Sequence, residues 1–153
     1  MATKYKGSDK EVRALNSYIK LARAAEAVNA RTGRAYGAAG LSVSQFGVLE
    51  ALFHGGPLCQ RDLARKILKS SGNITMVIDN LEKRRLVQRE RDAADRRFIT
   101  VHLTDAGRQL IGSIFPQQVA EILAEMSALT EEEQDELGRL CRKLGLSQGG
   151  GQE

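Results

Sequence analysis

The sequence predicts a mainly α-helical protein with one small β-hairpin. Apolar residues recur every three to four positions over most of the 153 residues, which is the spacing of amphipathic helices. The period changes to two between residues 87 and 103, where two strand-like segments flank a charged turn. Hydrophobic residues make up 42% of the chain and charged residues 27%, so we expect a single globular domain over 1–153.

Two helices are expected in the first third of the chain. Apolar residues recur at helical spacing over 9–31, and the Gly- and Ala-rich segment 32–40 should end that helix. Ser42, with Gln45 three residues later, is typical of a capping box and should begin a second helix over 43–54. Two glycines and a proline then end this second helix.

Two more helices and a hairpin should follow. The helices are expected over 60–68, with Cys59 at the N-cap, and over 71–85. Strands are expected over 87–91 and 98–103, as a two-stranded hairpin with a charged tip. The second of these helices should bury one apolar stripe, made of Ile74, Val77, Ile78 and Leu81.

The C-terminal third should contain two helices and a tail. Thr104 should cap a helix over 105–127, and Pro116 should kink it because proline removes a backbone hydrogen bond. A Thr-Glu capping box should begin a last helix over about 130–144. The Gly- and Gln-rich tail, 147–153, is expected to be flexible.

Charge is distributed unevenly along the chain, whose formal net charge is +4. Eleven basic residues oppose six acidic ones between positions 61 and 97, whereas four oppose nine between positions 104 and 153. A basic segment attracts a polyanion such as nucleic acid, which suggests a separate role for the acidic C-terminal segment. A solvated basic surface would give the same counts, so charge alone does not identify the partner.

Short helices followed by a charged hairpin predict a winged helix-turn-helix over residues 42–104. The major groove of duplex DNA admits one helix, whose first residues reach the base edges. An arginine at the hairpin tip could enter the minor groove. We therefore expect DNA contacts from the start of the fourth helix, from cations near it and from the tip. These residues are Ser70, Ser71, Asn73, Thr75 and Met76, then Arg61 and Lys69, and then Arg96 and Arg97.

Several of these residues have a simpler structural interpretation. Met76 could fill a gap as well as contact a base, and Arg96 and Arg97 could belong to a solvated turn. The rival function is a winged-helix module that binds proteins instead of DNA. The polar outward face of the fourth helix favours DNA, because a protein-binding surface would be more apolar.

Several short motifs follow one another between residues 60 and 107. They are RDLA at 61–64, GNIT at 72–75, DNLEK at 79–83, LV at 86–87, DRR at 95–97 and VHLTDAG at 101–107. Taken together, these segments resemble the MarR family of bacterial regulators. Their order along the chain is more specific than any one of them. The flanking helices also fit the family in length and order.

The resemblance implies a homodimer that binds a palindromic site in double-stranded DNA. Residues 9–35 and 105–145 would form the dimerisation helices, and Asp95 would orient Arg97 for the minor groove. It also implies a transcriptional regulator, usually a repressor, that a small molecule or an oxidant releases from DNA. The wing and C-terminal segments look most like members that respond to phenolic or quinone compounds.

The sequence departs from the family pattern at two places. Arg85 stands where many members have glycine, which should slightly strain the turn before the first hairpin strand. Ala93 and Ala94 make the wing tip less charged than usual, which should leave fewer phosphate contacts.

The remaining candidate residues would bind a small-molecule effector or respond to oxidants. Tyr18, Phe46 and His54 are candidates for an effector site, since His54 ends the second helix near the family's effector cleft. Cys59 could be a reactive thiol of a redox sensor or a thiol-dependent enzyme, although a simple replacement for a capping serine is the favoured interpretation. No metal-ligand spacing, cofactor motif, signal peptide or membrane span is evident, so we expect a cytoplasmic protein that is not an enzyme.

Overall fold

The computed structural model of the chain describes residues 2–67 and 71–146, and nothing is described of the side chains of Ser71 and Gly72. The expectations for Lys69, Ser70 and the tail 147–153 therefore lie outside the described residues. The elements in chain order are α1 (Asp9–Arg31), α2 (Arg34–Ala38), α3 (Val43–Gly55), β1 (Leu58–Cys59), α4 (Gln60–Lys66), α5 (Ser71–Lys83), β2 (Val87–Arg91), β3 (Ile99–Leu103), α6 (Asp105–Met126) and α7 (Glu131–Leu146).

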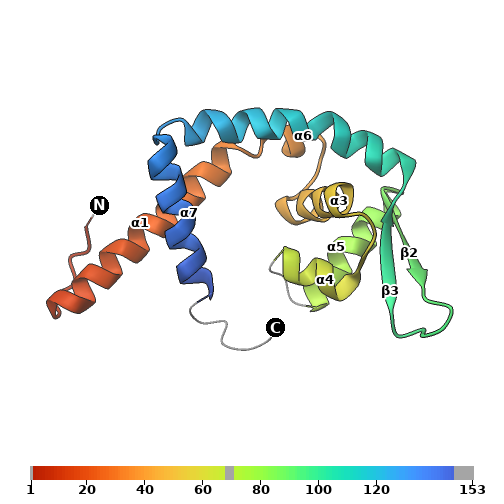
Figure 1. The fold of residues 1–153 in the computed structure, drawn as a ribbon, viewed down its shortest axis with the longest axis horizontal. Coiled ribbons are helices and arrows are strands. Elements are labelled where there is room, and N and C mark those ends of the chain that lie inside the picture. The colour runs from red at the N-terminus through yellow and green to blue at the C-terminus, as the bar shows by residue number, and fades with distance from the viewer. Residues whose placement is uncertain (1, 68–70, 147–153) are drawn as a thin grey trace.

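The long helix α6 joins two groups of elements (Figure 1). Helices α1 and α7 lie at its C-terminal end, and the elements from α3 to β3 lie at its N-terminal end. The predicted capping boxes at Ser42 and at Thr130 are both present, so local sequence signals do begin α3 and α7. The predicted fold class, mainly helical with a small β-sheet wing, is confirmed.

The hydrophobic core lies among α3, α4, α5, the strands and the first half of α6. Ile74, Ile78 and Leu81 from α5 are each at most 1% exposed, as their spacing predicts, and Val77 is half-buried. Burying one such side chain stabilises the fold by about 1.5–3 kcal/mol. The other large side chains that are almost completely buried are Leu49, Leu52, Leu63, Ile111, Val48, Val87 and Val101.

The sheet has three strands, so the prediction of a two-stranded hairpin was incomplete. The strand order is β1-β3-β2, and both pairings are antiparallel. Strand β1 consists of only Leu58 and Cys59, which pair with Val101 and Thr100. Two residues are too few to display a period of two, so the pattern that revealed β2 and β3 could not reveal β1.

The segment 32–40 was expected to be only a helix break, but it contains the short helix α2. Ala35 is buried, and the Tyr36 ring stacks on Phe46 with 5.0 Å between centroids. Helix α2 also packs against α6. These tertiary contacts stabilise five helical residues that the neighbouring glycines disfavour.

Helix α6 is continuous from Asp105 to Met126 with Pro116 inside it. The Thr104 side chain accepts a hydrogen bond from the Gly107 amide, as expected of an N-cap. The kink at Pro116 stays a prediction. Within the described residues, no helix is both long enough and apolar enough to cross a membrane.

Candidate nucleic-acid interface

Helix α5 divides cleanly into a buried face and an exposed face. Ile74 and Ile78 point into the core, whereas Asn73, Thr75 and Met76 are exposed, with Met76 at 62%. Ser71 begins this helix, but its side chain lies outside the described residues. The face that the sequence assigned to DNA is therefore on the surface for the three predicted side chains that are described.

The hairpin of β2 and β3 is the wing of the fold. Its tip is held by its own hydrogen bonds, because the Asp92 carboxylate accepts from the amides of Ala94 at 2.8 Å and Asp95 at 2.9 Å. Such a carboxylate turn needs no charge at the next two positions, which explains why two alanines are tolerated here. Arg96 is exposed next to this turn.

Asp95 and Arg97 form a two-point ion pair at the wing tip. The Arg97 Nε lies 3.0 Å from Asp95 Oδ1, and a terminal guanidinium nitrogen lies 2.8 Å from Oδ2. The hydrogen bond from Arg97 lowers the pKa of Asp95, and the same bond raises the pKa of Arg97. The pair is therefore ionised at neutral pH. The Arg97 side chain is still 89% exposed, so this contact orients it while leaving it accessible.

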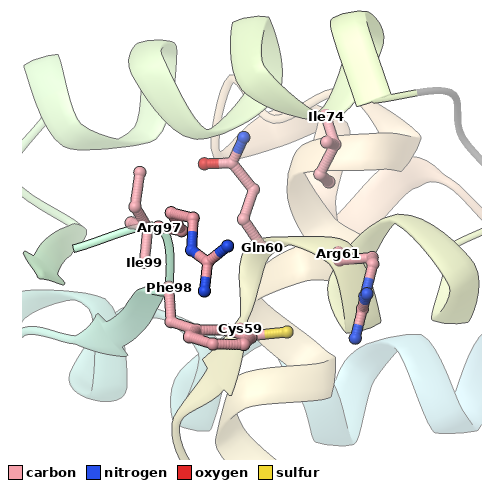
Figure 2. Close-up of a pocket in the computed structure, with 7 residues that line it drawn as sticks. All are labelled: Cys59, Gln60, Arg61, Ile74, Arg97, Phe98 and Ile99. Carbon is pink, nitrogen blue, oxygen red and sulfur yellow. The ribbon is translucent and has the colours of Figure 1, made fainter. Parts of the chain in front are cut away.

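A hollow of about 290 Å³ separates the wing from α4 and α5 (Figure 2). Ile74, Phe98 and Ile99 contribute apolar surface to it, and Arg61 and Arg97 bring two cations. Two predicted DNA-binding arginines, one from α4 and one from the wing, thus line the same surface depression. Figure 2 shows the two guanidinium groups on opposite sides of the Cys59 sulfur in this view.

Cys59 occupies the N-cap of α4, as expected, but its side chain makes no capping hydrogen bond. Cys59 therefore takes the position of a capping serine, but it does not make the hydrogen bond that a capping serine would make. Sulfur is a weak acceptor, and the residue is already fixed by its pairing with Thr100 in the sheet. Its side chain is half-buried and lines the hollow.

The three effector candidates lie in three different environments. Tyr18 is 66% exposed on α1, where it lines an apolar groove beside α7. Phe46 is buried in the core against Tyr36. His54 packs edge-on against Phe53 and Phe115, with centroids 5.1 and 4.6 Å away. His54 and Tyr18 line two separate pockets and Phe46 lines neither of them, so these three residues do not form a shared site within the described chain.

Sequence reasoning missed three residues that organise this surface. Arg89 and Gln60 connect β2, α4 and α5 through hydrogen bonds. Arg84 donates to the carbonyls of Gly40 at 2.9 Å and Ala39 at 3.0 Å, which ties the end of α5 to the loop before α3. Arg89 had one visible signal, since it follows the buried Val87 at a period of two and should therefore face inward.

The geometry defines a winged helix-turn-helix protein of the kind that binds DNA. The family model described as "MarR family" matches residues 39–97. The transcriptional regulator YkoM of Bacillus subtilis, whose own role is uncharacterised, is 37% identical over 88% of this chain and 87% of its own length. The regulator MhqR of the same organism is 35% identical over 88% of this chain and 93% of its own length.

A solved structure supports the same assignment. BpsR of Bordetella bronchiseptica is 27% identical, covers 84% of this chain and 98% of its own, and has a TM-score of 0.76. The DNA binding of BpsR is regulated by 6-hydroxynicotinic acid. The present chain belongs to the MarR family of transcriptional regulators, and it is therefore a DNA-binding regulator and not an enzyme.

Proposed function

We propose that this protein is a homodimeric repressor that binds a palindromic operator and leaves it when a small aromatic or electrophilic compound binds. The observation that carries the proposal is the joint exposure of α5 and of the wing arginine. In Figure 1, α5 and the hairpin belong to the same group of elements at one end of α6. A helix for the major groove and a wing for the adjacent minor groove are thus offered by one rigid unit.

The DNA contacts in this proposal divide by type. Asn73, Thr75 and Met76 face the base edges, together with Ser70 and Ser71, and Asp95 orients Arg97 for the minor groove. Arg61, Lys69 and Arg96 contact backbone phosphates. Support comes from the positive charge of the segment 61–97 and from the exposure of Arg61, Asn73, Thr75, Met76, Arg96 and Arg97.

The dimer is supported by apolar surface that a single chain leaves uncovered. Neither α1 nor α7 buries any residue in the isolated chain, although α7 carries a regular row of leucines. Contact between water and so many large apolar side chains is unfavourable. We therefore infer that a second copy of the chain packs against the helices 9–35 and 105–145 and covers this surface. The exposed members are Tyr18, Leu21, Val119, Ile122, Leu123, Leu137, Leu140 and Leu144.

The effector class rests on the relatives. The DNA binding of BpsR is regulated by a hydroxylated aromatic acid, which agrees with the phenol- and quinone-responsive branch suggested by the wing. Tyr18 and His54 remain candidate contacts, because each lies beside other apolar or aromatic groups. A regulator of this kind acts where the chromosome lies, and we place it in the cytoplasm.

Selection of bound sequences from random duplex DNA tests the proposal. An inverted repeat should be recovered, and Arg97→Ala should weaken binding to it about tenfold or more. Binding should also fall steeply with added salt, because phosphate contacts release counterions. Added phenols, quinones or 6-hydroxynicotinic acid should release the DNA if the effector class is right. Recovery of no sequence, with unchanged affinity for the Arg97→Ala variant, would instead favour a protein-interaction module.

A further inference from the structure

Arg89 lies in the middle of β2, on the face of the strand that packs toward α5. It follows the buried Val87 by two residues, and in the sheet it stands opposite Val101, which is completely buried. A charged group at such a position needs partners for its donors. The side chain of Arg89 is only 20% exposed, and the structure provides those partners.

The Arg89 guanidinium makes contacts along one face of α5. Its terminal nitrogens lie 2.6 Å from Asp79 Oδ1 and 2.6 Å from Glu82 Oε2, and one of them donates to the Thr75 carbonyl at 3.2 Å. Asp79 and Glu82 are three residues apart, so their carboxylates lie on the same side of α5, facing β2, and the backbone carbonyl of Thr75, one turn before Asp79, completes the set. A planar guanidinium with fixed donors holds such a set at one orientation.

Gln60 extends this network to α4. Its side-chain oxygen accepts from Arg89 Nε at 3.3 Å, and its amide nitrogen donates to the Thr75 hydroxyl at 2.8 Å. Gln60 is the first residue of α4 and follows β1 directly. Two side chains therefore join β2, α4 and α5 at one point.

Beyond Arg89, β3 is still paired with β1 through Thr100 and Cys59, and past that pair the wing has no hydrogen bond to α4 or α5 among the described residues. In the described part of the chain, the hydrogen bonds of the tip stay within the wing, as between Arg91 and the Arg96 carbonyl or Asp92 and Phe98. The hollow of Figure 2 lies between Arg97 and the helices. Among the described residues, Arg89 is thus the last side chain along β2 that forms a hydrogen bond or ion pair with α5.

We propose that Arg89, held by Gln60, is a positioning residue that keeps the wing in register with α5 so that both reach DNA together. The inference rests on the proposed DNA-binding function and adds to it a residue that need not touch DNA. Loss of Arg89 would let the wing tilt about the base of the hairpin, and the contribution of Arg97 to binding would then be lost. Binding by α5 alone would remain.

A double-mutant cycle on the selected operator measures this dependence. Arg97→Ala is expected to weaken binding about tenfold in the otherwise native protein. In an Arg89→Gln background the same change should weaken binding by less than about threefold, because the wing is already displaced. Equal losses in both backgrounds would overturn the proposal, since a residue that acts only through general stability lowers affinity additively.

Two controls separate position from charge. Arg91→Gln removes a cation from the same strand, but Arg91 is exposed and donates only to the Arg96 carbonyl, at 3.4 Å, in the described chain. The full Arg97→Ala loss should persist in that background. The triple variant Arg89→Gln, Asp79→Asn, Glu82→Gln removes the uncompensated carboxylates as well. If the triple variant regained native affinity and the full Arg97→Ala loss, Arg89 would be only a neutralising charge and the proposal would be wrong.

A measurement without DNA keeps this test independent of the proposed function. Amide hydrogen exchange over 91–98 should be faster in Arg89→Gln than in Arg91→Gln, with exchange in α3 unchanged. If Arg89→Gln does not fold, as judged by circular dichroism, Gln60→Leu replaces it because it removes two hydrogen bonds and no charge. Its wing should also exchange faster, and unchanged exchange in the variant that folds would contradict the proposal. Failure of the native protein to bind DNA would overturn the proposed function alone.

Discussion

Arg85 shows how one residue can conflict with its backbone. It has a φ of 58°, the one positive value at a non-glycine residue in the described chain. The amides of Arg85 and Leu86 donate to the carbonyls of Glu82 and Leu81, which closes α5 with a Schellman motif. That motif requires a left-handed residue, and glycine meets the requirement without a side-chain clash. The strain expected from the departure at this position is confirmed.

Replacing Arg85 with glycine should therefore stabilise the protein. The left-handed conformation costs a residue with a Cβ about 1 kcal/mol, so Arg85→Gly should raise the free energy of unfolding by about that amount. Chemical denaturation monitored by circular dichroism measures the change. Lys83→Gly is the matched control, because it lies within α5 and should lower the free energy by about 0.5–1 kcal/mol. A destabilised Arg85→Gly variant would contradict the interpretation.

At the scale of the elements, the start of α6 is placed by a close approach of backbones. A Cβ at Gly107 would collide with the carbonyl oxygen of Leu86, and the Thr104 hydroxyl donates to the Arg85 carbonyl at 2.7 Å. The turn after α5 and the first turn of α6 are therefore in direct contact. This contact explains why the segment that ends the winged domain has a glycine three residues after its capping threonine.

Gly107→Ala should consequently disrupt this junction. The added methyl group meets backbone and not a flexible side chain, so we expect a loss of about 1–3 kcal/mol in the free energy of unfolding. Gly112→Ala, on the same helix, meets only the Phe53 ring at 3.8 Å and should gain about 0.5–1 kcal/mol from helix propensity. Thermal and urea unfolding of both variants compare the two effects. Similar results for the two alanines would show that the junction tolerates a side chain.

At the scale of the whole molecule, α1, α7 and the C-terminal half of α6 leave a large apolar surface uncovered in the single chain. Leu123 is 68% exposed and Leu144 is 58% exposed, while α1 and α7 enclose an apolar groove of about 500 Å³. Cys141 lines this groove and is also exposed in the single chain. Such a surface is typical of an interface between subunits.

Leu123→Glu combined with Leu144→Glu should convert the proposed dimer into monomers. Sedimentation equilibrium measures the mass, and the variant should also lose affinity for the full inverted repeat while keeping weak binding to a half-site. Val43→Glu is the control, because Val43 is 61% exposed on α3, outside the proposed interface. A native protein that is monomeric, or a variant that still dimerises, would refute the proposed interface.

The amino-acid sequence by itself determined every described helix except α2, and it determined the buried face of α5. Ser42 with Gln45, and Thr130 with Glu133, are capping pairs within four residues, and the spacing of Ile74, Ile78 and Leu81 selects one side of α5. These signals are local, because hydrogen bonds and periodicity in a helix involve near neighbours. The Asp95–Arg97 ion pair could also be predicted, because the two residues are close in sequence and the family resemblance implied that they interact.

Only the tertiary structure decided which segments far apart in the sequence contact one another. Leu58 becomes a strand residue because Val101 pairs with it, and α2 becomes helical where it packs on α6. Phe46 lies in the core whereas Tyr18 lines the groove beside α7, and this separation depends on how distant helices pack. Arg89 finds partners on α4 and α5 only after the chain closes around it. Such contacts depend on loop closure and on the packing of whole elements, and neither is encoded in a short stretch of sequence.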